Sequence, residues 1–145
     1  MSIRDRFLAY SDAFEKSLAD DDWSRVEPYF TEDAVYEGEP RAAGRAAVIA
    51  KFRDSVEGFD RRMDSRRPTF QPPTVDGDTL TMRWSVTYTK AGLPDVVISG
   101  VQTVVFAGDR IARLSDRLDP GRQEALERWM AEHGKGLNAL KDWEK

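Results

Sequence analysis

The 145-residue chain has no cysteine, a single histidine and no apolar run long enough to span a membrane. Without cysteine there are no disulfides and no thiol chemistry, which fits a reducing compartment, and we expect a cytoplasmic protein. One histidine, His133, excludes mechanisms that need a histidine pair. A transition-metal site would then need carboxylates alone, so we expect neither a metal nor a cofactor. The polar N-terminal stretch lacks the apolar core of a signal peptide, and we expect no membrane contact.

Charge and length further restrict the kind of protein that this chain can be. Asp and Glu number 26 against 22 Lys and Arg, and the net charge of -4 argues against nucleic acid as a partner. One basic cluster, Arg61-Arg62 with Arg66-Arg67, is interpreted as a charged edge strand. A chain of this length with 40% hydrophobic residues is expected to form one domain, residues 1–145, with a core at 5–132 and a tail at 134–145.

The first half of the chain has helical periodicity. Ser2 is a predicted cap for a first helix that ends near Asp20, and Asp22 is a predicted cap for a second, short helix. Residues 34–38 form a predicted short strand, and a third helix begins at Gly44. The apolar faces of the first and third helices are Phe7, Tyr10, Phe14 and Leu18, and Val48, Phe52, Val56 and Phe59.

After residue 61 the period changes to two, which is typical of strands. We predict strands at 62–70, 80–88, 95–106 and 110–118, with an Asp76-Gly77 hairpin turn. Asp119-Pro120 then begins a helix that Gly134 ends, with His133 in its last turn. The tail from Lys135 on is expected to dock a last half-helix through Leu137, Leu140 and Trp143. This order predicts an α+β fold in which helices pack on one face of a curved, mostly antiparallel sheet.

The long strand 95–106 is apolar on both faces. Val96, Ile98, Val104 and Phe106 alternate with Val97, Val101 and Val105. A sheet with one solvent-exposed face needs apolar side chains on the other face alone, so the second apolar set is expected to be covered as well. No predicted helix remains to cover it. We therefore expect a homodimer through the outer face of the sheet. The alternative is a strand that is rich in valine for β propensity alone.

Asp116 stands on an otherwise apolar strand face, between Leu114 and Leu118. Burying an unpaired carboxylate costs about 1.4 kcal/mol for each unit by which its pKa rises. Such a residue therefore has either a partner or a function. The structural alternative is an ion pair with Arg62 or Arg66, or solvation at the strand end.

On these residues the chain resembles the nuclear-transport-factor-2-like superfamily and, within it, the SnoaL-like polyketide cyclases. The resemblance covers residues 5–132 and rests on Asp22-Trp23, the segment 29–36, Gly44-Arg45 and the segment 111–118. It implies a cone, with a bent sheet wrapped around long helices and a deep apolar pocket. The superfamily includes isomerases, dehydratases, epoxide hydrolases, cyclases and non-catalytic binding modules, so the fold alone does not decide function.

The known chemistries of the superfamily can be tested residue by residue. Ketosteroid isomerases need a carboxylate base, a tyrosine and a protonated aspartate, and the matching positions hold Gly38, Phe14 and Gln102. Glu39 could replace the base only through a bulge. Limonene-type epoxide hydrolases need an Asp–Arg–Asp set, and this resemblance supplies Asp116 and an outward-facing Arg83, with Ser85 in place of the second aspartate.

Two further chemistries of the superfamily remain. Dehydratases of the scytalone type need pocket histidines, and His133 is alone and away from the pocket. SnoaL-like cyclases use an acid on the final strand as general acid/base, and Asp116 resembles that residue.

The alternation places a set of mostly aromatic side chains around Asp116, which suits an apolar, ring-containing ligand. We predict Asp116 as general acid/base with a raised pKa, and Gln102, with Tyr36 or Tyr88, as the donors that hold a ligand oxygen. Gln102 could instead bond Asp116. Two functions stay open: a cofactor-free isomerase, cyclase or hydrolase, and a non-catalytic ligand-binding or accessory domain. The predicted lining residues are Tyr10, Phe14, Tyr36, Phe52, Val56, Trp84, Val86, Tyr88, Val104 and Leu114.

Overall fold

A computed structural model of the chain describes residues 2–38 and 41–143, with side chains for residues 2–38 and 41–135. The helices and strands follow the predicted order. They are α1 (Ile3–Asp20), the short 3-10 helices η1 (Trp23–Arg25) and η2 (Glu27–Tyr29), β1 (Phe30–Glu37), β2 (Ala42–Ala43), α2 (Arg45–Gly58), η3 (Asp60–Arg62), β3 (Ser65–Phe70), β4 (Thr74–Asp76), β5 (Thr79–Lys90), β6 (Leu93–Ala107), β7 (Arg110–Leu118) and α3 (Arg122–Trp143).

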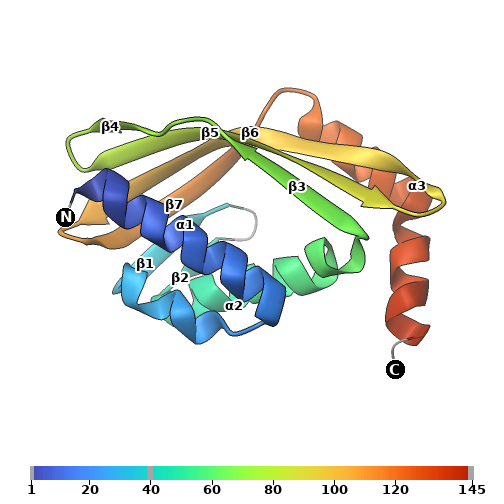
Figure 1. Cartoon of the computed structure of the whole chain (residues 1–145), viewed down its shortest axis with the longest axis horizontal. Helices are drawn as coiled ribbons and strands as arrows, with labels where there is room; N and C mark the ends of the chain where they lie inside the picture. Colours follow the sequence, from blue (N-terminus) through green and yellow to red (C-terminus); the bar gives the residue numbers. More distant parts are fainter. Residues whose placement is uncertain (1, 39–40, 144–145) are drawn as a thin grey trace.

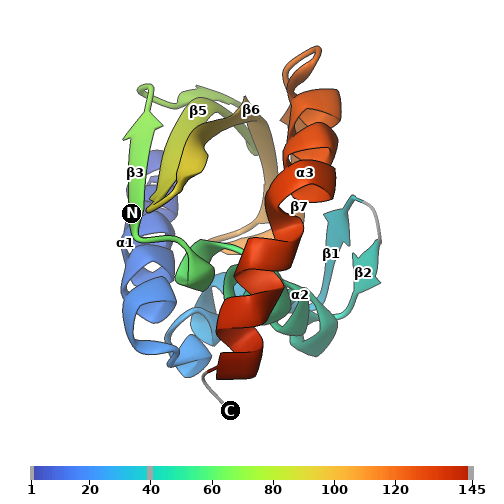
Figure 2. The ribbon, with the colours of Figure 1, turned by 90° about the vertical axis from the view of Figure 1, so that its right-hand side faces the viewer.

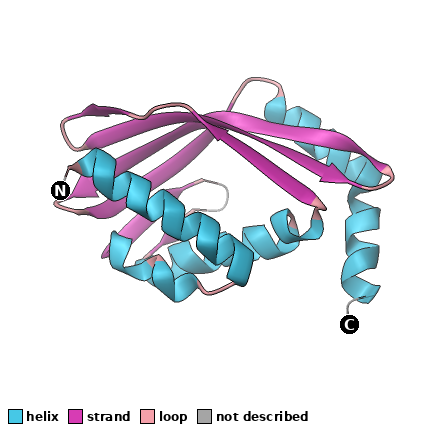
Figure 3. Cartoon of the chain, in the orientation of Figure 1, coloured by secondary structure: helices cyan, strands magenta, loops and turns pink. Residues whose placement is uncertain are grey.

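All seven strands belong to one sheet, in the order β2-β1-β7-β6-β5-β3, with β4 paired to β5. The β1–β7 pair is parallel, and the other pairs are antiparallel. The sheet curves over α1 and α2, which lie on its concave side (Figures 1 and 3). The predicted α+β class is confirmed.

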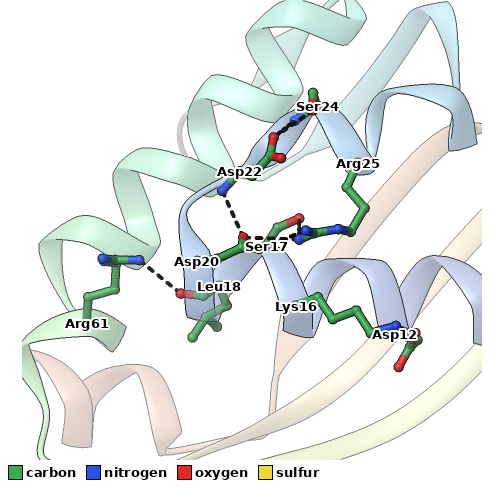
Figure 4. Close-up of polar contacts among 9 residues, drawn as sticks. All are labelled: Asp12, Lys16, Ser17, Leu18, Asp20, Asp22, Ser24, Arg25 and Arg61. Atoms are coloured by element: carbon green, nitrogen blue, oxygen red, sulfur yellow. Dashed lines mark hydrogen bonds and ion pairs between the residues drawn. The ribbon is translucent and has the colours of Figure 1, made fainter.

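Helix α1 begins at the predicted cap, where the Ser2 hydroxyl accepts a hydrogen bond from the Asp5 amide at 3.1 Å. At its other end the Asp20 carboxylate pairs with Arg25 at 2.7 Å. Figure 4 draws this contact. The Arg25 hydrogen bond is the main reason why the pKa of Asp20 falls to about 2. Arg61 donates to the Leu18 carbonyl at 3.1 Å and so ties η3 to α1.

The basic cluster does not form one strand. Arg66 and Arg67 lie on β3, which is an edge strand as predicted, but Arg61 and Arg62 lie in η3. The Arg62 side chain is buried and contacts Glu57 at 3.4 Å, so it does not form part of a solvated charged edge.

The core packs between α1, α2 and the concave face of the sheet. The largest side chains that are fully buried there include Phe7, Phe30, Leu80, Ile111 and Leu114. A second cluster joins Trp129 of α3 to Tyr88 and Val96 at the other end of β5 and β6, and the Trp129 indole donates to the Pro94 carbonyl at 2.9 Å. Helix α3 thus crosses the open end of the curved sheet (Figure 2).

The boundaries predicted for the last helix were wrong. Helix α3 begins at Arg122, because the Asp119 carboxylate accepts from Arg83 and Ser99 instead of capping a helix at Pro120. It continues through Gly134, which does not adopt the positive φ of a glycine that ends a helix. The predicted contacts of Leu137, Leu140 and Trp143 lie outside the described side chains. No described helix is long and apolar enough to cross a membrane.

Candidate functional site

A cavity of about 290 Å³ lies between the concave face of the sheet and helices α1 and α2. Ten of the twelve predicted site residues lie on its wall. From the helices come Tyr10, Phe14, Phe52 and Val56, and from the strands come Tyr36, Trp84, Val86, Tyr88, Gln102 and Asp116. The strand residues meet because β5 and β6 pair in register, so that their inward-facing side chains form one surface.

Val104 and Leu114 do not line the cavity, which corrects their predicted place. They face each other across β6 and β7, one step beyond the Gln102–Asp116 pair on the same face. At that step the core closes, and their exposed fractions are 0% and 1%. Alternation identified the face correctly, but it does not say how deep along the strand the cavity reaches.

The Asp116 carboxylate is held by two donors from neighbouring strands. The Tyr36 hydroxyl donates to Oδ2 at 3.0 Å, and the Gln102 amide donates to Oδ1 at 3.2 Å. Gln102 stands directly opposite Asp116 in the β6–β7 ladder, and Tyr36 is paired with Leu114 in the parallel β1–β7 ladder. The side chain is half-buried and faces the cavity.

Burial raises the pKa of Asp116 above its ordinary value, because the charged carboxylate loses water. The hydrogen bonds from Tyr36 and Gln102, the nearby indole N–H of Trp84 and the positive charge of Lys51 lower the pKa but do not reverse the shift. Burial, together with the nearby Asp116 charge, also raises the pKa of the Tyr36 hydroxyl well above its usual range. Tyr36 therefore stays a donor at neutral pH.

No arginine pairs with Asp116 among the residues that the structure describes. Arg66 bonds Asp60 at 3.0 Å and also contacts Glu15, and Arg62 contacts Glu57. The two arginines that could have made Asp116 a structural ion pair are both occupied elsewhere.

The cavity wall carries a second polar cluster, which is centred on Asp60. It includes Tyr88, which lies four residues beyond Trp84 on β5. The Tyr88 hydroxyl and the Arg66 guanidinium both donate to Oδ2 of Asp60, at 2.7 and 3.0 Å, and Arg66 also pairs with Glu15 of α1. Burial and the Asp60 charge raise the pKa of Tyr88 well above its usual range. Tyr88 is thus occupied and does not serve the Asp116 end.

The prediction missed several wall residues. Lys51 and Ser55 share the cavity-facing side of α2 with Phe52. The sequence does not indicate this for Lys51, because a lysine beside an apolar stripe is usually solvent-exposed. Met82 and Ile98 carried a usable signal, since both follow the apolar phase of their strands. The remaining missed wall residues are Ser11, Glu15, Asp60, Arg66 and Phe70.

The residues considered for the other chemistries do not form those active sites. Arg83 faces out and pairs with Asp119 at 2.9 Å, and His133 packs against Trp129 on α3 in a tilted arrangement with ring centroids 5.5 Å apart. Phe14 lines the cavity without a hydroxyl, and Glu39 lies outside the described residues. Within the described parts of the chain, no three metal-ligating side chains come together.

Comparison with known proteins places this geometry in a family. A model of the SnoaL-like domain matches residues 8–114, and no curated protein matches. A proposed SnoaL-like polyketide cyclase from Shewanella denitrificans OS-217 is 18% identical, with a TM-score of 0.60 over 81% of this chain and 93% of that one.

Two other crystal structures contain small molecules. A protein of ketosteroid-isomerase-like fold from Catenulispora acidiphila DSM 44928, in complex with trimethylamine, is 14% identical, with a TM-score of 0.59 over 78% of this chain and 87% of that one. TerC, co-crystallised with polyporic acid, is 14% identical, with a TM-score of 0.64 over 90% and 99%. At these identities the likeness shows the fold.

Proposed function

The chain belongs to the SnoaL-like domain family, and we propose that it is a cofactor-free acid/base enzyme acting on an apolar, ring-containing carbonyl compound. Isomerisation and cyclisation can begin when Asp116 removes a proton from carbon, and hydrolysis when it removes one from an attacking water molecule. One observation carries the proposal: Asp116 lies on the wall of an aromatic cavity, where two neutral donors bond it and no described arginine pairs with it. That two proteins of the same fold were crystallised with small molecules supports a ligand in this cavity.

The proposed reaction moves one proton. Asp116 takes a proton from the carbon next to a ligand carbonyl, and returns it to carbon or to oxygen. Its raised pKa brings the carboxyl closer to the working pH of a general acid/base. Tyr36 and Gln102 act through Asp116, since both of their donors point at its oxygens. In this proposal they are positioning residues, which changes the role that the sequence predicted for Gln102.

Asp116→Asn tests this function. With 2-tetralone, a bicyclic ring ketone, in D₂O, we expect the native protein to accelerate deuterium exchange at the carbon next to the carbonyl. The variant should lose this acceleration by about 10²-fold or more. Asp95→Asn, an exposed change on β6, is the matched control. Exchange is followed by NMR. A variant as active as the native protein contradicts the proposal.

The same variant has an expected stability signature with a definite sign. Since the folded pKa of Asp116 is raised, the folded protein holds a proton there at pH values where the unfolded chain has lost it. Stability is therefore lost as pH rises from about 4, the ordinary pKa of Asp, through the folded pKa. At neutral pH Asp116→Asn should be as stable as the native protein or more stable, and the gain should vanish in acid. A clear loss of thermal stability would instead indicate a structural ion pair.

A non-catalytic binding or accessory domain is the second candidate, because the cavity could hold a ligand without turnover. In that case 2-tetralone binds, but the native protein does not accelerate exchange. Binding measured by calorimetry beside the exchange experiment separates the two functions.

We also propose a homodimer through the outer face of the sheet. Val97, Val101 and Val105 remain only partly buried on β6, and α3 packs against the opposite, concave face. Native mass spectrometry should give twice the chain mass. Val101→Lys should shift the protein to the monomer, because a charge there would be buried in the interface. A monomeric native protein contradicts the proposal.

A further inference from the structure

We propose that Lys51 and Trp84 bind an ionised oxygen of the ligand beside Asp116, so that the cavity selects enolates and phenolates over neutral ring compounds. This inference rests on the proposed function, because it names the substrate class of the same site. It gives the site a donor pair that the sequence did not reveal.

The donors expected to hold a ligand oxygen are not free. Tyr36 and Gln102 both donate to Asp116, and Tyr88 donates to Asp60. A developing negative charge on the ligand would therefore need other donors on the same part of the wall.

Lys51 supplies a positive charge at this place. It is half-buried on the cavity-facing side of α2, and its ammonium lies 4.9 Å from the centroid of the Tyr36 ring. Tyr36 in turn bonds Asp116, and the Lys51 charge acts on that carboxyl. Within the described part of the chain Lys51 has no carboxylate partner at ion-pair distance. Arg66, the other cation on the wall, is shared by Asp60 and Glu15.

Trp84 supplies an unused donor. Its indole N–H is buried and has no hydrogen-bond partner of good geometry within the described residues, although it lies near enough to Asp116 to lower the pKa of that carboxyl. A buried donor without an acceptor is unfavourable, and a ligand oxygen in the cavity would relieve it. Tyr10, also on the wall, has a hydroxyl that bonds no described group.

An anionic oxygen here must avoid repulsion from Asp116. Because burial already favours the neutral carboxyl, a ligand anion is expected to complete that protonation, and binding should take up a proton. Lys51 then neutralises the ligand, and the proton neutralises Asp116. Glu15 and Asp60 do not interfere, since both are held by Arg66 at the other end of the cavity.

The test compares two coloured probes of nearly equal shape. 2-Hydroxy-1,4-naphthoquinone is an enolate at neutral pH, and 2-methoxy-1,4-naphthoquinone is neutral. We expect the native protein to bind the enolate at least tenfold more tightly, by calorimetry and by the visible spectrum. Lys51→Met should abolish that preference, and Lys51→Arg should restore most of it. Lys16→Met, which removes an exposed lysine of α1, is the matched control and should keep the preference.

Two further variants separate this inference from the proposed function. Trp84→Phe should weaken enolate binding several-fold while it leaves Lys51 in place. Asp116→Asn should bind the enolate more tightly and without proton uptake, since the competing charge is gone. Equal binding of the two probes, binding of neither probe, or an unchanged preference in Lys51→Met overturns the inference. The exchange of 2-tetralone by the native protein and its loss in Asp116→Asn are measured separately, so failure of this inference is distinguished from failure of the proposed function.

Discussion

Replacing Gly100 by alanine is expected to destabilise the protein by about 3 kcal/mol or more, which corresponds to roughly 10 °C in Tm. Gly100 lies buried on β6, opposite Leu118 of β7 and Trp84 of β5. A Cβ atom there would collide with the backbone carbonyl of Arg117. Backbone atoms cannot rotate away, so the β6–β7 pairing would have to open next to the Gln102–Asp116 pair.

Gly58→Ala is the matched control for Gly100→Ala. Gly58 is the last residue of α2, and a Cβ atom added there meets no atom within 4 Å. We expect this change to be neutral or slightly stabilising, because alanine favours helix. Thermal unfolding followed by circular dichroism measures both variants. Equal stability of Gly100→Ala and the native protein would show that β6 and β7 do not approach so closely.

Leu114→Ala is expected to cost 2–5 kcal/mol, the usual range for a large core side chain cut to alanine. Leu114 is 1% exposed and belongs to the main core cluster, outside the cavity wall. Its loss should therefore leave an empty space in the core while the affinity for 2-tetralone changes little. Chemical denaturation gives the first quantity and calorimetry the second.

Ile98→Ala provides the comparison for Leu114→Ala. Ile98 is half-buried on the cavity wall, so its removal enlarges an existing space and should cost less stability. Its effect should appear mainly in ligand affinity. If Leu114→Ala lowered affinity more than Ile98→Ala did, the placement of Leu114 outside the cavity would be contradicted.

Local patterns predicted most of the fold. The strand 110–118 was predicted with the bounds that β7 has, and Ser2 caps α1 as expected. These features depend on side-chain alternation and on a hydrogen bond between residues three positions apart. Both are local, so they can be predicted from the sequence. The end of α3 was missed, because a glycine ends a helix only if its φ becomes positive, and residue type does not determine that.

Some residues of the candidate site could likewise be predicted from the sequence, and others could not. Asp116 and Gln102 stood out as polar residues on apolar strand faces, and the structure brings them together at 3.2 Å. Asp60 and Lys51 gave no such signal, because charged residues beside a helix end or an apolar stripe are ordinary on surfaces. Their contribution to the cavity depends on how α2 and η3 pack beneath the sheet.

The sequence by itself determined which residues face the interior of this protein, and it identified an acid among them, because alternation along a strand is a local property. Only the tertiary structure decided what that acid contacts and where the cavity ends. Pairing between Tyr36 and Asp116 joins residues 80 positions apart, and the depth of a cavity depends on helices that the strand pattern does not describe. Likewise, 65 positions in the sequence separate Lys51 from the Asp116 carboxyl, whose pKa its charge lowers.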